Sequence, residues 1–251
     1  MKKQFLFFGA ILAALSIFSL ISCKTESDDD GYKGFTEVNT GFSGTYLYAE
    51  LRNGMVSGGE SFSIVKVYDF KTNRRVDYGR IKETNINNSG KTDTKKSFEL
   101  YTKKDSTLTW TENGETITAT IEDENTLKIG DKSYKKTTAS FIYAYAFIIN
   151  KTVKYSVYVL NADNTYTLET KIEEMNSSET SIDTAGSVTE NGTYSISGKD
   201  ITFTSSNGTK TGKTFTSTED SWEYLDLGDK VTLTGENGET DFIYIKYRKL
   251  K

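Results

Sequence analysis

The sequence predicts an all-β protein built from antiparallel meanders, and three observations support this fold class. The pentapeptide Glu-Asn-Gly-Glu-Thr occurs twice between strand-like runs, at residues 112–116 and 236–240. Asn-Gly supplies the two positive-φ residues that a type I′ hairpin turn requires. The composition is also polar, with 35% hydrophobic residues, 16 Tyr and 14 Phe, which is typical of strands that have one face in water.

Four turns each predict a strand pairing, and each pairing can be checked by the side chains that it brings together. The turns are Asn113-Gly114, Asn237-Gly238, Gly198-Lys199 and Ala162-Asp163. The predicted pairs are Trp110 with Ile117, Leu108 with Ala119, Leu233 with Phe242, Val231 with Tyr244, Ile196 with Ile201, Tyr194 with Phe203, Val159 with Tyr166, and Val157 with Leu168. Every predicted hairpin therefore gathers apolar side chains on one face.

From Gly44 onward the alternation of apolar and polar residues predicts two series of short strands. The first series is expected at 44–51, 61–70, 74–82, 97–103, 106–111, 115–122, 126–129 and 132–136. The second is expected at 140–149, 153–160, 165–173, 192–197, 200–205, 213–217, 230–235 and 240–249, with 222–227 either a further strand or a turn segment. A change of pattern at Thr137-Thr138 divides them into an N-terminal β unit, 42–138, and a C-terminal β unit, 139–251.

Each series contains one long polar segment after its third strand, at residues 83–96 and 174–191, and we expect both segments to be loops. Eight-stranded antiparallel meanders tend to close into barrels, because closure removes the exposed edges on which other chains could pair. We therefore expect two barrel units in tandem.

The N-terminus carries Lys2 and Lys3 before the apolar run 5–21, which is typical of a secretory signal, although the run could also form a short transmembrane helix. The sequence Leu20-Ile21-Ser22-Cys23 resembles the lipobox of bacterial lipoproteins. This resemblance implies a signal peptide, 1–22, cleavage before Cys23, and lipidation of Cys23 with fatty acids such as palmitate. Residues 23–41 would then be a flexible tether, and Lys24 favours the outer membrane over the inner one.

Composition limits the chemistry of the chain. His is absent and Cys occurs once, so the chain has no Ser-His-Asp triad, no His-based zinc site and no intramolecular disulfide. Removal of Lys2 and Lys3 with the signal peptide would take the formal charge from −4 to −4 − 2 = −6, which argues against nucleic acid as a partner. We expect no cofactor, no metal site and no enzymatic activity, with a carboxylate-dependent glycosidase as a less favoured possibility.

The C-terminal half resembles the lipocalin-like domains of bacterial lipoproteins. The resemblance is carried by Gly192-Thr193-Tyr194, the alternating run 195–204, Val231-Thr232-Leu233 and the aromatic strand 242–247. It implies a barrel whose interior is packed or holds one small ligand. The aromatic residues expected to line a core or a ligand site are Trp110, Tyr194, Phe203, Trp222 and Phe242.

Two hypotheses about function follow. The first is a membrane-anchored, noncatalytic β lipoprotein that binds a protein or glycan partner through its long loops. The alternative is a periplasmic-side carrier of a small apolar ligand inside a lipocalin-like barrel. Because bulky aromatic residues occupy many inward positions, we expect Tyr194, Ile196, Ile201, Phe203, Leu233 and Phe242 to fill the barrel, which favours the first hypothesis.

Overall fold

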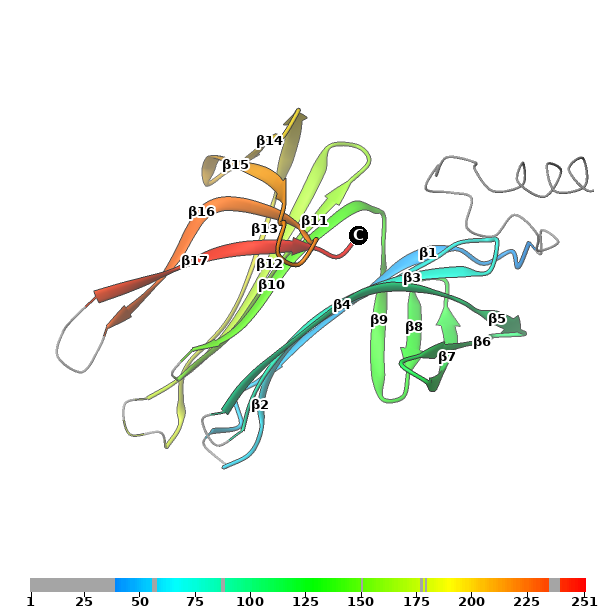
Figure 1. The fold of residues 1–251 in the computed structure, drawn as a ribbon, viewed down its shortest axis with the longest axis horizontal. Coiled ribbons are helices and arrows are strands. Elements are labelled where there is room, and N and C mark those ends of the chain that lie inside the picture. The colour runs from blue at the N-terminus through cyan, green and yellow to red at the C-terminus, as the bar shows by residue number, and fades with distance from the viewer. Residues whose placement is uncertain are drawn as a thin grey trace, which may run out of the picture. The chain divides into compact units, whose positions relative to one another are not determined.

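A computed structural model describes residues 39–55, 58–86, 89–149, 151–176, 178, 180–234 and 240–251. Residues 39–251 belong to one compact unit. The described residues form a nine-stranded antiparallel sheet followed by a closed eight-stranded barrel (Figure 1). The predicted all-β fold of antiparallel meanders is therefore confirmed. Cys23, with the predicted signal peptide and most of the tether, lies outside the described residues.

The nine-stranded sheet has the order β4-β3-β2-β1-β9-β8-β7-β6-β5. Its strands are β1 (Gly44–Arg52), β2 (Ser61–Phe70), β3 (Arg75–Ile86), β4 (Ser89–Leu100), β5 (Thr102–Lys104), β6 (Thr107–Glu112), β7 (Glu115–Asp123), β8 (Thr126–Ile129) and β9 (Lys132–Thr137). The two edge strands are β4 and β5, and β4 comes into contact with β6. The sheet is thus strongly curved and nearly closed, with nine strands where eight were expected.

The barrel follows immediately, and its strands pair in chain order before the last returns to the first. They are β10 (Ala139–Ile149), β11 (Thr152–Asn161), β12 (Thr165–Met175), β13 (Ile182–Ser197), β14 (Asp200–Ser205), β15 (Gly208–Thr216), β16 (Glu223–Thr234) and β17 (Thr240–Lys249). The two segments predicted at 222–227 and 230–235 form the single strand β16. An irregularity between Asp226 and Lys230 interrupts it, where Gly228 has a φ of 69°.

The expectation that both long polar segments are loops is wrong. Residues 83–96 contribute to the hairpin of β3 and β4, and residues 182–191 belong to β13. These strands are polar because they lie at sheet edges or have exposed faces, and charged residues on an edge strand discourage pairing with other chains. In the second segment only residues 176–181 connect two strands.

Two of the four predicted registers are confirmed and two are wrong by one residue. Asn113-Gly114 and Gly198-Lys199 give the predicted partners, with φ values of 55° and 82° at Asn113 and Gly114. Across the Ala162-Asp163 turn, however, Leu160 faces Tyr166. This loop is one residue longer than predicted, and Asn164 within it has a positive φ of 63°. Near residues 235–239, Thr232 and not Leu233 faces Phe242.

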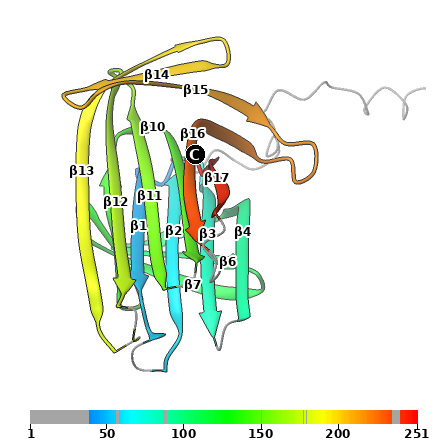
Figure 2. The same cartoon turned by 90° about the vertical axis from the view of Figure 1, so that its left-hand side faces the viewer.

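The misread register of β11 has a physical cause, since both faces of this strand are buried. One face lies inside the barrel, and the other packs with β10 against the outer face of β1–β3 (Figure 2). A one-residue shift exchanges the two faces, but both carry apolar side chains, so alternation could not choose between them. This shared core contains Leu51, Val65, Val67, Ile81, Ala139, Ile142, Ala144, Val153, Tyr155 and Val157.

Polar contacts also join the sheet to the barrel. The Ser63 hydroxyl donates to the Lys154 carbonyl at 2.8 Å, and the backbone N–H of Asn53 donates to Glu173 Oε2 at 2.9 Å. At Gly79, a Cβ would lie 2.7 Å from the Leu250 carbonyl oxygen, so only glycine permits this approach. The chain passes from sheet to barrel at Thr138, and the division into two independent domains stays a prediction.

Candidate functional site

The five aromatic residues singled out in the sequence lie in separate parts of the structure. Trp110 is buried inside the nine-stranded sheet, and Trp222 packs beside the shared core. Tyr194 and Phe203 are buried inside the barrel. Phe242 is 42% exposed, so the expectation that it lies inside the barrel is wrong. These residues do not form one site.

A packed aromatic layer fills the end of the barrel near β14 and β15. The Phe203 ring lies 4.8 Å from that of Tyr158 and 5.0 Å from that of Tyr166, and Tyr247 lies 5.1 Å from Tyr158. Burial raises the pKa of Tyr158 and Tyr247 and keeps both phenols neutral. The expectation of a packed interior is confirmed for this layer, although Ile196, at its rim, is 48% exposed.

The opposite end of the barrel, toward the connection between β12 and β13, is built differently. Here β13 pairs with β14 only through residues 192–197, and β15 pairs with β16 only through residues 223–226 of β16. The pairing of β10 with β17 is limited to Tyr143 and Ala144 with Lys249 and Arg248. Beyond these contacts the β16–β17 hairpin lies apart from β13 in both ribbon views (Figures 1 and 2). We call this part of the barrel the open end.

Inward-facing side chains at the open end are exposed to solvent. Val188 lies opposite Thr170, on the face of β13 that carries Tyr194, and it is 61% exposed. Ile243 lies opposite Val231, on the face of β17 that carries Ile245, and it is 40% exposed. Large apolar side chains on an inner barrel face are normally covered, so their exposure marks a surface that could receive a ligand.

Polar groups are placed between the aromatic layer and the open end. Asp229 accepts hydrogen bonds from Lys210 Nζ at 2.5 Å and from the Tyr247 hydroxyl at 2.9 Å. Glu190 accepts hydrogen bonds from the Tyr166 hydroxyl and from Asn207, and these lower its pKa. Both carboxylates accept hydrogen bonds from two side chains each, which fits a structural role better than proton transfer.

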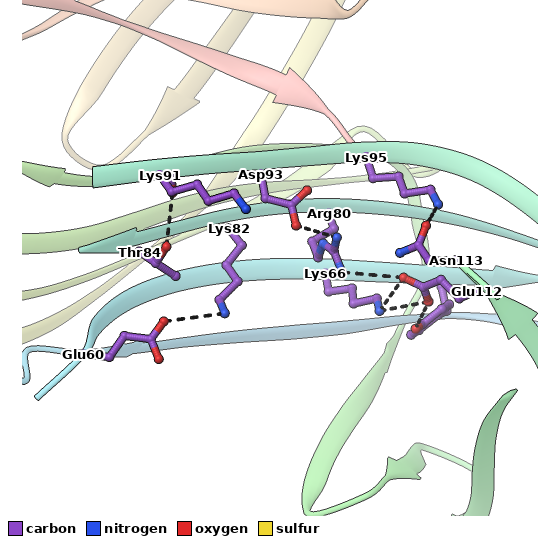
Figure 3. Close-up of polar contacts among 11 residues, drawn as sticks. Glu60, Lys66, Arg80, Lys82, Thr84, Lys91, Asp93, Lys95, Glu112 and Asn113 are labelled. Carbon is purple, nitrogen blue, oxygen red and sulfur yellow. Dashed lines mark hydrogen bonds and ion pairs between the residues drawn. The ribbon is translucent and has the colours of Figure 1, made fainter. Parts of the chain in front are cut away.

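A second polar cluster lies on the inner face of the nine-stranded sheet (Figure 3). Lys66, Arg80 and Lys95 are direct neighbours across β2, β3 and β4. Glu112, at the end of β6, accepts from Lys66 Nζ at 3.0 Å through both carboxylate oxygens and from the Tyr68 hydroxyl at 2.8 Å. We call these four charged residues the charged seam, because they connect β2–β4 with β6 across the gap in the sheet.

Burial makes the seam electrostatically strong. The side chains of Lys66 and Glu112 are only 11% and 4% exposed, and Arg80 Nη1 lies 3.7 Å from Glu112 Oε1. Burial lowers the pKa of Lys66, while the Glu112 carboxylate opposes that effect. This cluster was not predicted from the sequence. A signal was available, since Lys66 interrupts the apolar run Val65-Lys66-Val67 and Glu112 begins the turn already identified.

Other expected absences remain predictions. Within the part of the chain that the structure describes, no group of three or more Asp, Glu, His or Cys side chains could hold a metal ion. The described residues include no helix long and apolar enough to span a membrane. Comparisons with models of protein families, with curated proteins and with solved structures find no match to this chain.

Proposed function

We propose that this protein is a noncatalytic lipoprotein of a bacterial cell envelope that binds a small apolar ligand at the open end of its barrel. The observation that carries the proposal is the exposure of Val188 and Ile243 on the inner face of the barrel. Burial of apolar area stabilises a complex by about 25 cal/mol per Å², so a ligand covering both side chains would gain affinity. This proposal follows the carrier hypothesis made from the sequence, with the ligand bound at one end of the barrel.

The packed aromatic layer limits how far a ligand can enter the barrel, and therefore how long the ligand can be. Phe203 and Tyr158 are 2% and 3% exposed, so the interior beyond them has no room without rearrangement. A ligand would therefore contact the inner faces of β12, β13 and β17 and end at this layer. The partly buried side chains of Phe147 and Leu168 pack against the layer and would form the floor of the ligand site.

Titration of residues 24–251 with a fluorescent apolar probe, such as a naphthylamine, tests the proposal. We expect saturable binding with one probe per chain. Val188→Asp and Ile243→Ser should each weaken binding at least tenfold with little change in the melting temperature, because both side chains are already largely exposed. Phe98→Ser is the matched control, since Phe98 is 45% exposed on a strand of the other sheet. Equal affinity in all three variants would contradict the proposal.

A protein partner is a second candidate, favoured by the outer face of the β16–β17 hairpin. There Phe242 and Tyr244 are 42% and 66% exposed, next to Ile243 on the opposite face. The predicted recognition loops at 83–96 and 174–191 are largely strands, so this hairpin is the better location for partner contacts. Double substitution of Phe242 and Tyr244 by Ser should abolish partner capture and leave probe binding intact.

Lipid anchoring is part of the proposal and rests on the lipobox resemblance at residues 20–23. Two or three acyl chains on Cys23 would hold the protein firmly at the membrane, because each buried methylene contributes about 0.8 kcal/mol. Cys23→Ala should abolish labelling with radioactive palmitate and leave an uncleaved precursor. Cys23→Ser controls for side-chain size and should behave in the same way. Normal labelling of either variant would contradict the assignment, and protease treatment of intact cells would show which face of the outer membrane carries the protein.

A further inference from the structure

The charged seam contains more positive charge and more hydrogen-bond donors than the described residues satisfy. Lys66, Arg80 and Lys95 lie side by side on adjacent strands, an arrangement that is repulsive unless it is compensated. Glu112 compensates Lys66, and Asp93 accepts from Arg80 Nη2 at 2.6 Å. In the described part of the chain, Lys95 contacts no carboxylate and donates only to the neutral amide oxygen of Asn113.

Three buried donors in the same region have no acceptor among the described residues. They are the Tyr78 hydroxyl, Arg80 Nε and Trp110 Nε1. Tyr78 and Trp110 are each 2% exposed. Tyr78 is two residues from Arg80 on the same face of β3, and Lys95 Nζ lies 5.6 Å from the centre of its ring. Buried donors in proteins are nearly always paired, because an unsatisfied one is destabilising, so three unpaired donors in one region call for an acceptor.

We propose that the charged seam is a binding site for a small inorganic oxyanion of the phosphate or sulfate type. Such an ion is an acceptor only, so it matches a site that has surplus donors and surplus positive charge. Arg80 Nε, the Tyr78 hydroxyl and Lys95 Nζ would bind its oxygens, and Trp110 Nε1 would add a donor from β6. This site lies in the nine-stranded sheet and does not depend on the proposed barrel ligand.

Asp93 already binds the Arg80 guanidinium through Nη2, next to the Nε at which the oxyanion would bind. Its side chain is 42% exposed, so it can turn into solvent at little cost when an anion arrives, whereas Glu112 is 4% exposed and cannot. The two carboxylates therefore have different roles. Glu112 compensates Lys66 permanently, and Asp93 competes with the anion for Arg80.

Isothermal titration calorimetry of residues 24–251 with inorganic phosphate and, separately, sulfate tests this inference. Gluconate keeps the ionic strength constant during each titration. We expect one site per chain. Lys95→Gln should weaken binding at least tenfold, and Asp93→Asn should tighten it several-fold by removing the competitor. Lys91→Gln is the matched control, because Lys91 is an exposed lysine on the same strand and should leave the affinity unchanged.

Tyr78→Phe provides a further test, because it should have opposite effects on thermal stability relative to the unsubstituted protein without and with oxyanion. Without added oxyanion, this variant should melt at or above the temperature of the unsubstituted protein, because it lacks a buried unsatisfied hydroxyl. With phosphate, the unsubstituted protein should gain melting temperature and Tyr78→Phe should gain less. Absence of binding, an equal response to chloride, or an equal loss of affinity in Lys91→Gln and Lys95→Gln would overturn the inference.

Discussion

The two sheets of this protein close in different ways. The barrel is closed by backbone hydrogen bonds between neighbouring strands, including those that join β13 to β17 in sequence and β17 to β10. These strands surround a layer of packed aromatic rings. In the nine-stranded sheet, β4 and β5 remain edges, and side chains of the charged seam connect β2–β4 with β6. The difference shows that a curved meander can be held together either by strand pairing or by a buried ion pair.

Each arrangement leaves one region of its sheet with exposed apolar side chains or with unpaired hydrogen-bond donors. The barrel closes along only part of its length, so its open end exposes Val188 and Ile243. The nine-stranded sheet is connected across its gap by charges, and its interior retains surplus donors at Tyr78 and Arg80. Binding to apolar groups is therefore expected in the barrel and binding to anions in the sheet.

The largest effect is expected from the aromatic layer of the barrel. Phe203→Ala removes a ring that is 2% exposed and contacts two other rings, and it should lower the free energy of unfolding by about 3–5 kcal/mol. Urea unfolding measures this. Phe98→Ala, at a 45% exposed ring, should cost less than about 1 kcal/mol, and equal losses would mean that the barrel is not packed.

Loss of the counter-charge in the seam should have the next largest effect. Glu112→Gln leaves Lys66 buried without a carboxylate and should cost about 3 kcal/mol in the free energy of unfolding. Replacing both residues together, with Lys66→Met and Glu112→Leu, should recover most of that loss, because neither charge then remains buried. A double variant as unstable as Glu112→Gln would show that the seam does not act through charge.

A smaller, pH-dependent effect is expected at Asp69, where the sheet meets the C-terminus. Burial alone would raise the pKa of this carboxyl, but hydrogen bonds from Lys71 and Thr45 and the charge of Lys251 at 3.3 Å lower it. A lowered pKa contributes stability above the unfolded value of about 3.9, and this is lost as the pH falls through the folded value. Asp69→Asn should therefore cost about 1–2 kcal/mol at pH 7, and this cost should shrink as the pH falls below the unfolded value of about 3.9. A difference that stays constant with pH would contradict this.

The smallest effect concerns the turn that begins β7. Gly114 has a φ of 82° and no heavy atom near the position of a Cβ, so Gly114→Ala should cost about 1 kcal/mol through backbone conformation alone. Gly186→Ala is the control, since its Cβ would make an ordinary 3.7 Å contact with Ile172. Thermal unfolding should show a lower melting temperature for the first variant only.

Local turn chemistry predicted the fold class and the registers at Asn113-Gly114 and Gly198-Lys199. It failed at Ala162-Asp163, because both faces of β11 are buried and alternation carries no information there. It also failed at residues 83–96 and 174–191, where polar strands resemble loops. Lys66 within an apolar run and Glu112 at a turn were local signals of the charged seam. Its full membership could not be predicted, since Lys66, Arg80, Lys95 and Glu112 come together only through the curvature of the sheet. Contacts between distant strands decide such features.

Partial closure of the barrel is tested most directly by residue-resolved amide hydrogen exchange along β13. In residues 192–197, which pair with β12 or β14, the amides directed at these strands should exchange slowly. In residues 182–191, which pair only with β12 in the described part of the chain, alternate amides should exchange at nearly the rate of a free chain. Uniformly slow exchange from 182 to 197 would mean that the barrel is closed along its whole length, and it would contradict the open end.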